Sequence, residues 1–322
     1  MLEANIHQKL KYLKNIIIIL VACFALDYFS IIDFRELLKI DRSVAVATLL
    51  PCTLILLVVN SLAAIRWVMT VNRFLGTSIG LIDGMTVTFK SGLFAYFLPG
   101  QLGSELGRVV LASRGKSSEV LNHAVTSAII DRLMALVSML MMTTIFIAWA
   151  LVHRYKFINI FLISFGLFIA AIGLVHLGTR LLRGVIFVFK KNRYIDYIGN
   201  ILKMLKMFII ERPTFCMLML ACSMLLNLVV AYVTYLIVSR VFHPMDFSTV
   251  ALMSLVSNLS SVVPLTPGGV GVSEMAFRET GSLMQGVSIG NLAGGYIIYR
   301  IINIFSYLVG LILLEINERI RA

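Results

Sequence analysis

Charged residues are scarce in this 322-residue sequence: they make up 14% of it, whereas hydrophobic residues make up 59%. The mean hydropathy is +0.94. Soluble domains have about a quarter charged residues, and no soluble fold could cover this much apolar surface. Apolar runs long enough to cross a hydrocarbon core of about 30 Å recur from one end of the chain to the other. We therefore predict a single polytopic membrane domain, 1–322.

Cysteine is also rare, and its four copies form no disulfide or metal motif. All four lie inside apolar runs, without a CxxC pair or a metal-ligand spacing to any histidine. The Gly-x-Ser-x-Gly, P-loop and HExxH patterns are absent as well. We therefore expect no metal site, no cofactor and none of the standard soluble catalytic chemistries.

Acidic residues are few, 16 against 28 lysines and arginines, which gives a formal net charge of +12. The basic residues lie in short segments between apolar runs rather than along one polar face, so we expect no nucleic-acid partner. The densest segment, 179–212, mixes aliphatic residues with Lys and Arg and predicts an amphipathic helix on the cytoplasmic surface. Its charge favours contact with anionic lipid.

Six apolar runs are long enough to be full transmembrane helices. They cover about 15–32, 43–65, 121–150, 157–178, 213–240 and 288–315. The first has no small-residue cleavage site, so we interpret it as a retained helix. Two further runs, 80–98 and 247–265, lead into Pro-Gly segments and then resume as shorter apolar segments. The fold class is therefore all-α, with six full helices and two broken segments.

The distribution of basic residues indicates how the broken segments cross. Short cytoplasmic loops carry an excess of Lys and Arg, so 179–212 belongs inside. A full crossing of the first broken segment would put that loop outside, whereas a re-entrant hairpin over 80–112 puts it inside. The same parity makes 247–287 a hairpin from the outside and leaves both termini cytoplasmic. The halves 1–152 and 153–322 then have opposite orientations, as in an inverted repeat.

The two broken segments share a motif. The first half contains Pro99, Gly100, Gly103, Glu105, Arg108, Asp131 and Arg132, and the second contains Pro267, Gly268, Gly269, Gly271, Glu274, Arg278 and Arg300. The glutamate precedes the distant arginine by 27 residues in the first half (105 to 132) and by 26 in the second (274 to 300). Discontinuous helices related in this way build the substrate sites of many secondary transporters. We take these residues as substrate-binding candidates.

The residue types favour an anionic substrate. Amide groups freed by a Pro-Gly break attract negative charge at the start of a half-helix, and the planar guanidinium group of arginine matches a phosphate. We therefore expect the amides of 100–103 and 268–271 to hold a phosphate together with Arg132 and Arg300. Structural alternatives stay open, because the two arginines could instead pair with Asp131 and Glu274.

The other polar residues near the breaks also have more than one interpretation. Glu105 and Glu274 could cap half-helices or carry a proton, with Asp131 as a third proton candidate. Arg108 and Arg278 follow the glutamates by about one helical turn, so they could pair with them or meet a lipid headgroup. Arg66 and Lys90 are secondary candidates, and Lys90 could snorkel. Asparagines in the apolar runs, Asn60, Asn227, Asn258 and Asn303, are expected to tie helices together.

At these motifs the chain resembles the lysylphosphatidylglycerol synthetase membrane-region family, also called the flippase-like integral membrane proteins. The resemblance covers nearly the whole chain and rests on Arg66-Trp67, Phe97-Leu98-Pro99-Gly100 to Glu105 with Arg108, Asp131-Arg132, and Pro267 to Gly271 with Glu274. It implies translocation of lipids or lipid-linked molecules between leaflets. No stretch after residue 316 could hold the family's soluble transferase domain, so we expect a stand-alone member and do not carry over the synthetase activity.

Together these inferences predict a flippase-like transporter of the cell (inner) membrane, not an enzyme, that translocates an anionic phospholipid or a lipid-linked phosphate. A membrane-embedded enzyme acting on a lipid phosphate is one alternative, although the sequence shows no nucleophile paired with a base. The other alternative is a non-transporting partner of a lipid-modifying enzyme. Chemical change of the lipid would distinguish the enzyme from the transporter.

Overall fold

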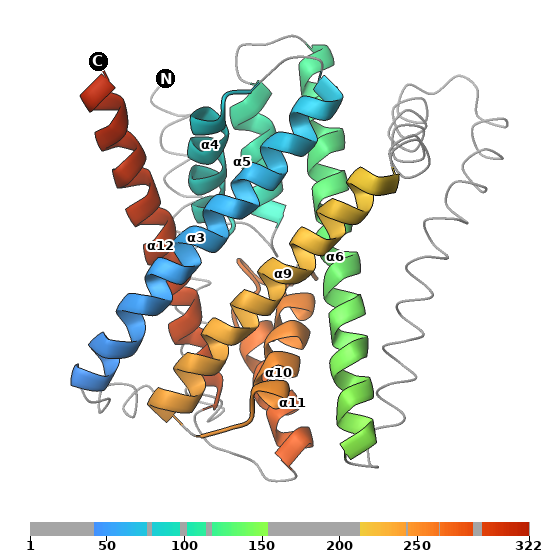
Figure 1. Cartoon of the computed structure of the whole chain (residues 1–322), viewed down its shortest axis with the longest axis vertical. Helices are drawn as coiled ribbons and strands as arrows, with labels where there is room; N and C mark the ends of the chain where they lie inside the picture. The colour runs from blue at the N-terminus through green and yellow to red at the C-terminus, as the bar shows by residue number, and fades with distance from the viewer. Residues whose placement is uncertain are drawn as a thin grey trace, which may run out of the picture.

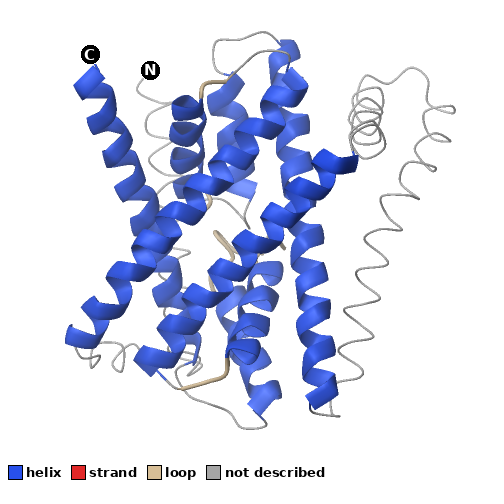
Figure 2. Cartoon of the chain, in the orientation of Figure 1, coloured by secondary structure: helices blue, strands red, loops and turns tan. Residues whose placement is uncertain are grey.

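The computed structural model describes residues 42–75, 79–96, 102–113, 118–153, 213–242, 244–263, 265–285 and 292–321. Within these ranges the regular elements are all helices and no strand occurs (Figure 2), which confirms the all-α prediction. The predicted helices 15–32 and 157–178, the basic segment 179–212 and the Pro99-Gly100 break lie outside the described residues.

Four long helices form the frame of the fold. They are α3 (Arg42–Leu75), α6 (Ser118–His153), α9 (Pro213–Ile237) and α12 (Leu292–Arg321), and α9 continues into a π-helical turn, η1 (Val238–Phe242). Each is long and apolar enough to cross a membrane, so four of the six predicted spans are confirmed as helices of sufficient length. Figure 1 shows α3 and α9 running side by side across the front of the bundle, between α12 and α6.

Two pairs of short helices complete the described fold. In the first pair α4 (Leu81–Phe94) packs against α5 (Leu102–Ser113), and in the second α10 (Phe247–Ser260) packs against α11 (Val272–Gln285). A 14-residue helix such as α4 is about 21 Å long, too short for a core of about 30 Å. The pairs occupy opposite ends of the bundle (Figure 1). The break between α10 and α11 lies where the sequence predicts it. Re-entry of either pair through one membrane face stays a prediction.

Glycine permits the close approach of chain segments at both breaks. A Cβ at Gly103 would lie 2.3 Å from the carbonyl oxygen of Phe94, so only glycine lets α5 begin against the last turn of α4. In the second break, Gly269 has a φ of +72°, and a Cβ there would lie 2.8 Å from the Cβ of Ser261. A positive φ of this size favours glycine. Gly103 therefore allows the start of α5 to lie against α4, and Gly269 allows the turn between α10 and α11.

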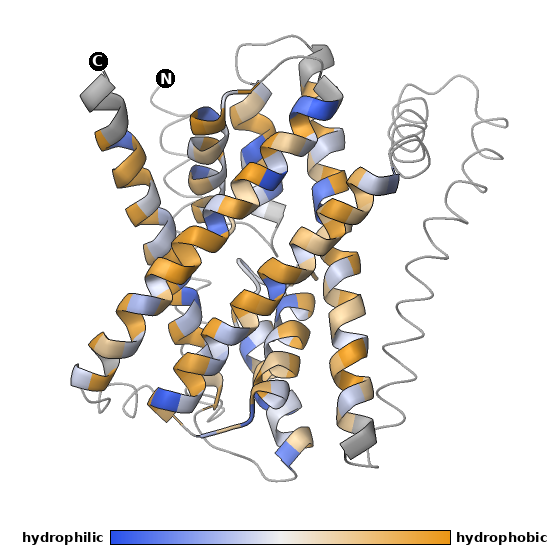
Figure 3. Ribbon diagram, in the orientation of Figure 1, coloured by the Kyte–Doolittle hydropathy of each residue, from blue (hydrophilic) through white to orange (hydrophobic). Residues whose placement is uncertain are grey.

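The long helices bury one face and expose another. On α3, Leu50, Leu54 and Val58 recur every four residues along one face, and each is more than half exposed. Figure 3 shows hydrophobic residues along the outer lengths of the long helices. Inside, the main core cluster joins α3, α9, α10, α11 and α12 through Leu56, Val233, Met253, Phe277 and Ile302. An exposed apolar stripe of this kind fits a helix that faces lipid.

Candidate functional site

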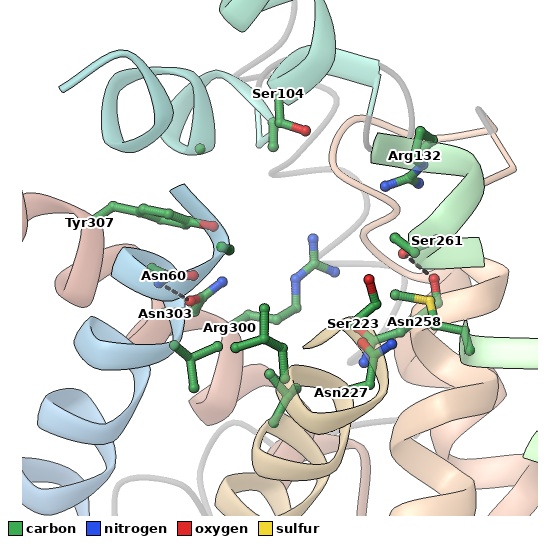
Figure 4. A pocket seen from close by; sticks show the side chains of 18 of the residues that line it. Asn60, Ser104, Arg132, Ser223, Asn227, Asn258, Ser261, Arg300, Asn303 and Tyr307 are labelled. Carbon is green, nitrogen blue, oxygen red and sulfur yellow. Dashed lines mark hydrogen bonds between the residues drawn. The ribbon is translucent and has the colours of Figure 1, made fainter. Parts of the chain in front are cut away.

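A cavity of about 230 Å³ lies among the long helices, with residues from both short-helix pairs in its wall. Of the sequence-predicted residues it is lined by Glu105, Arg108, Asp131, Arg132, Gly268 and Arg300, together with the secondary candidate Arg66. Figure 4 shows the guanidinium groups of Arg132 and Arg300 reaching into it from α6 and α12. The two halves of the sequence motif therefore meet at one cavity.

Asp131 of α6 is bound by two arginines from two other helices. Its Oδ1 lies 2.9 Å from Arg66 Nη2 of α3, and its Oδ2 lies 2.9 Å from Arg108 Nη1 of α5. The Asp131 side chain is 7% exposed. Arg66 also donates to the hydroxyl of Ser223 on α9, and Arg108 lies over the ring of Trp67 at 5.7 Å. One carboxylate thus serves two buried guanidinium groups.

Glu105 and Arg132 form a looser pair. Arg132 Nη1 of α6 lies 3.4 Å from Glu105 Oε1, near the first turn of α5. The other carboxylate oxygen accepts a hydrogen bond of 2.9 Å from the hydroxyl of Ser104. The side chains of Arg132 and Glu105 are 17% and 18% exposed. This pair therefore holds α5 to α6 with a long contact at a partly open position.

Glu274 and Arg300 form the tighter counterpart in the second half. Arg300 Nη1 of α12 lies 2.6 Å from Glu274 Oε1, and the Glu274 side chain is 1% exposed. The same nitrogen donates to Ser273 Oγ at 3.0 Å, and Nη2 donates to the carbonyl oxygen of Gly268. Glu274 Oε2 accepts from the N–H of Gly271 at 2.7 Å, as a residue capping the start of α11 does. Both structural interpretations of Glu274, cap and ion-pair partner, are confirmed.

The observed pairing differs from the prediction in the first half. Arg132 is paired with Glu105, whereas the structural alternative named Asp131 as its partner. The two oxygens of Asp131 are held by Arg66 and Arg108. Of the two alternatives for Arg108, pairing with Glu105 is not observed, because Arg108 donates to Asp131 instead. The reason is geometric: α3 and α5 both bring an arginine to the face of α6 that carries Asp131.

Several predicted residues lie away from the cavity wall. Lys90 is exposed and, like Arg278, does not line the cavity. The amide of Gly269 donates to the Thr266 carbonyl at 3.0 Å, and that of Gly271 donates to Glu274. These two amides already have acceptors, so the guanidinium groups are the better candidates for a phosphate.

Tyrosine and asparagine side chains outside the two sequence motifs complete the wall. Tyr296, Tyr299, Asn303 and Tyr307 line the cavity along one face of α12. Asn60 of α3 donates to Asn303 Oδ1 at 3.0 Å, which confirms the helix-tying role expected of both. Their spacing of three or four residues, inside an otherwise apolar helix, is the signal that could have found them.

The site as a whole carries an excess of positive charge. Four guanidinium groups (Arg66, Arg108, Arg132 and Arg300) face three carboxylates (Glu105, Asp131 and Glu274), which leaves one net positive charge among the described residues. In the part of the chain that the structure describes, no group of three or more His, Cys, Asp or Glu residues could hold a metal ion. What this arrangement can do chemically is bind an anion.

The comparisons with known proteins agree with the motif-based resemblance. The model of one family, described as the lysylphosphatidylglycerol synthase TM region, matches residues 13–310. Searches of curated proteins and of solved structures found no match. The family match spans all the cavity residues named above, so it covers the site as well as the helical frame.

Proposed function

The chain belongs to the lysylphosphatidylglycerol synthase TM region family and is a multi-pass membrane protein linked to lipid metabolism; from this premise we propose that it moves an anionic phospholipid or a lipid-linked phosphate between bilayer leaflets. The observation that carries the proposal is the buried cavity with its one net positive charge. In this proposal the headgroup phosphate binds in the cavity while the hydrocarbon tails stay in the lipid.

Energetics supports a functional reading of the arginines. An arginine at the centre of a membrane-spanning helix raises the free energy of membrane insertion by about 2.5–3.5 kcal/mol even on the permissive scale. Four arginines at one cavity therefore indicate either charged partners or a function. Ion pairing satisfies three of them, because three carboxylates are present. The remaining charge has a natural partner in a phosphate, which the guanidinium group binds with two parallel hydrogen bonds.

The arrangement of the short helices supports the transport mechanism. Pairs at opposite ends of the bundle (Figure 1) fit the proposed inverted repeat, with halves 1–152 and 153–322, and a site where the halves meet. Rocking one half against the other would expose the cavity to each leaflet in turn. We place the protein in the inner cell membrane with both termini cytoplasmic, on the charge distribution of the sequence.

Reconstitution in liposomes tests the proposal. The vesicles would contain a trace of fluorescent phosphatidylglycerol, an isoprenyl phosphate or phosphatidylcholine, and an impermeant quencher would report the outer-leaflet fraction. We expect protein-dependent exchange of an anionic lipid and not of phosphatidylcholine. Arg132→Gln should slow the exchange of anionic lipid about ten- to a hundredfold, because the loss of one or two charge-assisted hydrogen bonds weakens binding by about that factor. Arg240→Gln is the matched control, because Arg240 is exposed on η1 and does not line the cavity.

The same vesicles separate transport from the alternatives. Chromatography of the recovered lipid that showed a chemical change would favour a membrane-embedded enzyme. Unchanged lipid with no protein-dependent exchange would leave the role of a non-transporting partner of a lipid-modifying enzyme. Phosphatidylcholine carries a phosphate but no net charge, so its equal exchange would contradict a site that selects lipids by their net negative charge.

A further inference from the structure

The excess charge of the cavity is located on one cluster. The pairs Glu105–Arg132 and Glu274–Arg300 are each neutral. Asp131 is shared between two arginines at 2.9 Å each, so the cluster of Arg66, Asp131 and Arg108 carries the one net positive charge.

The hydrogen-bonding groups of this cluster are also incompletely used. The Nε atoms of Arg66 and Arg108 are buried, and neither has a hydrogen-bond partner among the described residues. Each guanidinium group offers five N–H donors, and an unpaired buried donor costs free energy. Both arginines line the cavity. Two donor-rich side chains therefore face one space with a single carboxylate between them.

Arg300 is in the opposite situation. Its terminal nitrogens are bonded to Glu274, to Ser273 and to the carbonyl of Gly268, and its guanidinium group lies 5.6 Å from the ring centre of Tyr96. These contacts join α12 to the turn between α10 and α11 and also reach the end of α4. A phosphate at Arg300 would compete with a carboxylate that is 1% exposed and lies 2.6 Å away.

We infer that Arg66 and Arg108, on either side of Asp131, form the primary binding site for a phosphate monoester or diester anion. Arg300 is instead a positioning residue that fixes α12 to the second short-helix pair. The anion competes with Asp131 for the N–H donors of the two arginines. It also supplies a second negatively charged acceptor, which two arginines that share one carboxylate lack. The inference that this phosphate belongs to a lipid headgroup rests on the proposed function. The inference that the two arginines bind a phosphate rests on the geometry.

Binding at this place would also connect the fold to transport. Arg66, Arg108 and Asp131 come from α3, α5 and α6, so an anion between the arginines adds a link between a long helix and the first short-helix pair. All three helices belong to the half 1–152, so the anion would be bound by one half of the proposed inverted repeat while the other half moves against it.

The test is the melting temperature of the purified protein in non-ionic detergent as inorganic phosphate replaces chloride at constant ionic strength. Phosphate should stabilise the native protein in proportion to its occupancy. Asp131→Asn removes the competing carboxylate, so its melting temperature should be lower without phosphate and should rise more when phosphate is added. Arg66→Gln and Arg108→Gln each leave a neutral pair with Asp131, so they should fold but bind phosphate about tenfold or more weakly. Arg240→Gln, at an exposed position on the η1 turn and away from the cavity wall, is the matched control and should keep the rise.

The outcomes separate this inference from the proposed function. A phosphate-dependent rise in Arg66→Gln and Arg108→Gln equal to that of the native protein would overturn the site, and so would an equal effect of chloride. If Asp131→Asn does not fold, the two arginine variants still decide. Short-chain phosphatidylglycerol acting at lower concentration than inorganic phosphate would identify a lipid source, whereas equal potency would identify free phosphate. An Arg66-dependent rise without lipid movement would refute transport and leave the site standing.

Discussion

The glutamate–arginine motif occurs twice, and the structure predicts unequal losses when the glutamate charge is removed. Glu274 is 1% exposed and lies 2.6 Å from Arg300, whereas Glu105 is 18% exposed and lies 3.4 Å from Arg132. Removing one partner of a buried ion pair costs about 3–5 kcal/mol, because the other charge is left buried. Glu274→Gln should therefore lower the free energy of unfolding by about that amount. Glu105→Gln should lower it by about 1 kcal/mol, the net value of one ordinary hydrogen bond.

Denaturant titration of the detergent-solubilised protein, followed by circular dichroism, measures these losses. Glu279→Gln is the matched control, because Glu279 is exposed on the same α11 helix and its replacement should change stability by less than about 0.5 kcal/mol. The double variant Glu274→Gln/Arg300→Gln should lose less than the sum of the single variants, since no unpaired charge remains. Equal losses for Glu274→Gln and Glu105→Gln, or strict additivity in the double variant, would refute the reasoning.

Two further predictions concern the short helices. Gly103→Ala should keep α4 and α5 apart, because the new Cβ would lie 2.3 Å from the Phe94 carbonyl oxygen, and size-exclusion chromatography should show less monodisperse protein. Gly80→Ala is the control and should leave the elution profile unchanged, because its Cβ meets only the end of one side chain at 3.1 Å. Asp246→Ala should cost about 1 kcal/mol, because Asp246 caps α10 by accepting from the Thr249 N–H. Burial raises the pKa of Asp246, but its hydrogen bonds outweigh this and lower it. The stabilisation that Asp246 provides should therefore be complete above its unfolded pKa of about 3.9 and be lost as pH falls through its folded pKa. Melting temperatures measured across this pH range should show the loss, and Asp246→Ala should remove this part of the pH dependence.

Hydropathy predicted where the long helices lie better than where they end. The second span was predicted to end near residue 65, whereas α3 continues to Leu75. Arg66 ends the apolar run in the sequence, but in the fold its charge is satisfied by Asp131, so the helix continues through it. The local sequence around Arg66 does not indicate a partner so distant in the chain. A prediction that ends a transmembrane helix at the first charged residue therefore ends α3 too early.

The site was predictable where the chemistry is local. Pro-Gly motifs marked both breaks, and the recurring spacing brought out the pairing of Glu274 with Arg300. The two partners of Asp131 were missed because they come from α3 and α5, and no spacing in the sequence indicates a carboxylate shared by two helices. The polar face of α12 was missed for another reason, since tyrosine in an apolar helix looks like ordinary packing.

The two glutamate–arginine pairs have different neighbours in the sequence. The residue before the distant arginine is Asp131 in the first half and Tyr299 in the second. The aspartate pairs with Arg66 and Arg108, and these two arginines exceed its charge by one. A tyrosine adds no charge, so Arg300 is balanced by its own glutamate and held in place. The shared motif thus builds two neutral pairs, and the excess positive charge lies beside the first of them. This asymmetry is why we propose that the anion binds against the first pair of short helices, with the second pair as a fixed support.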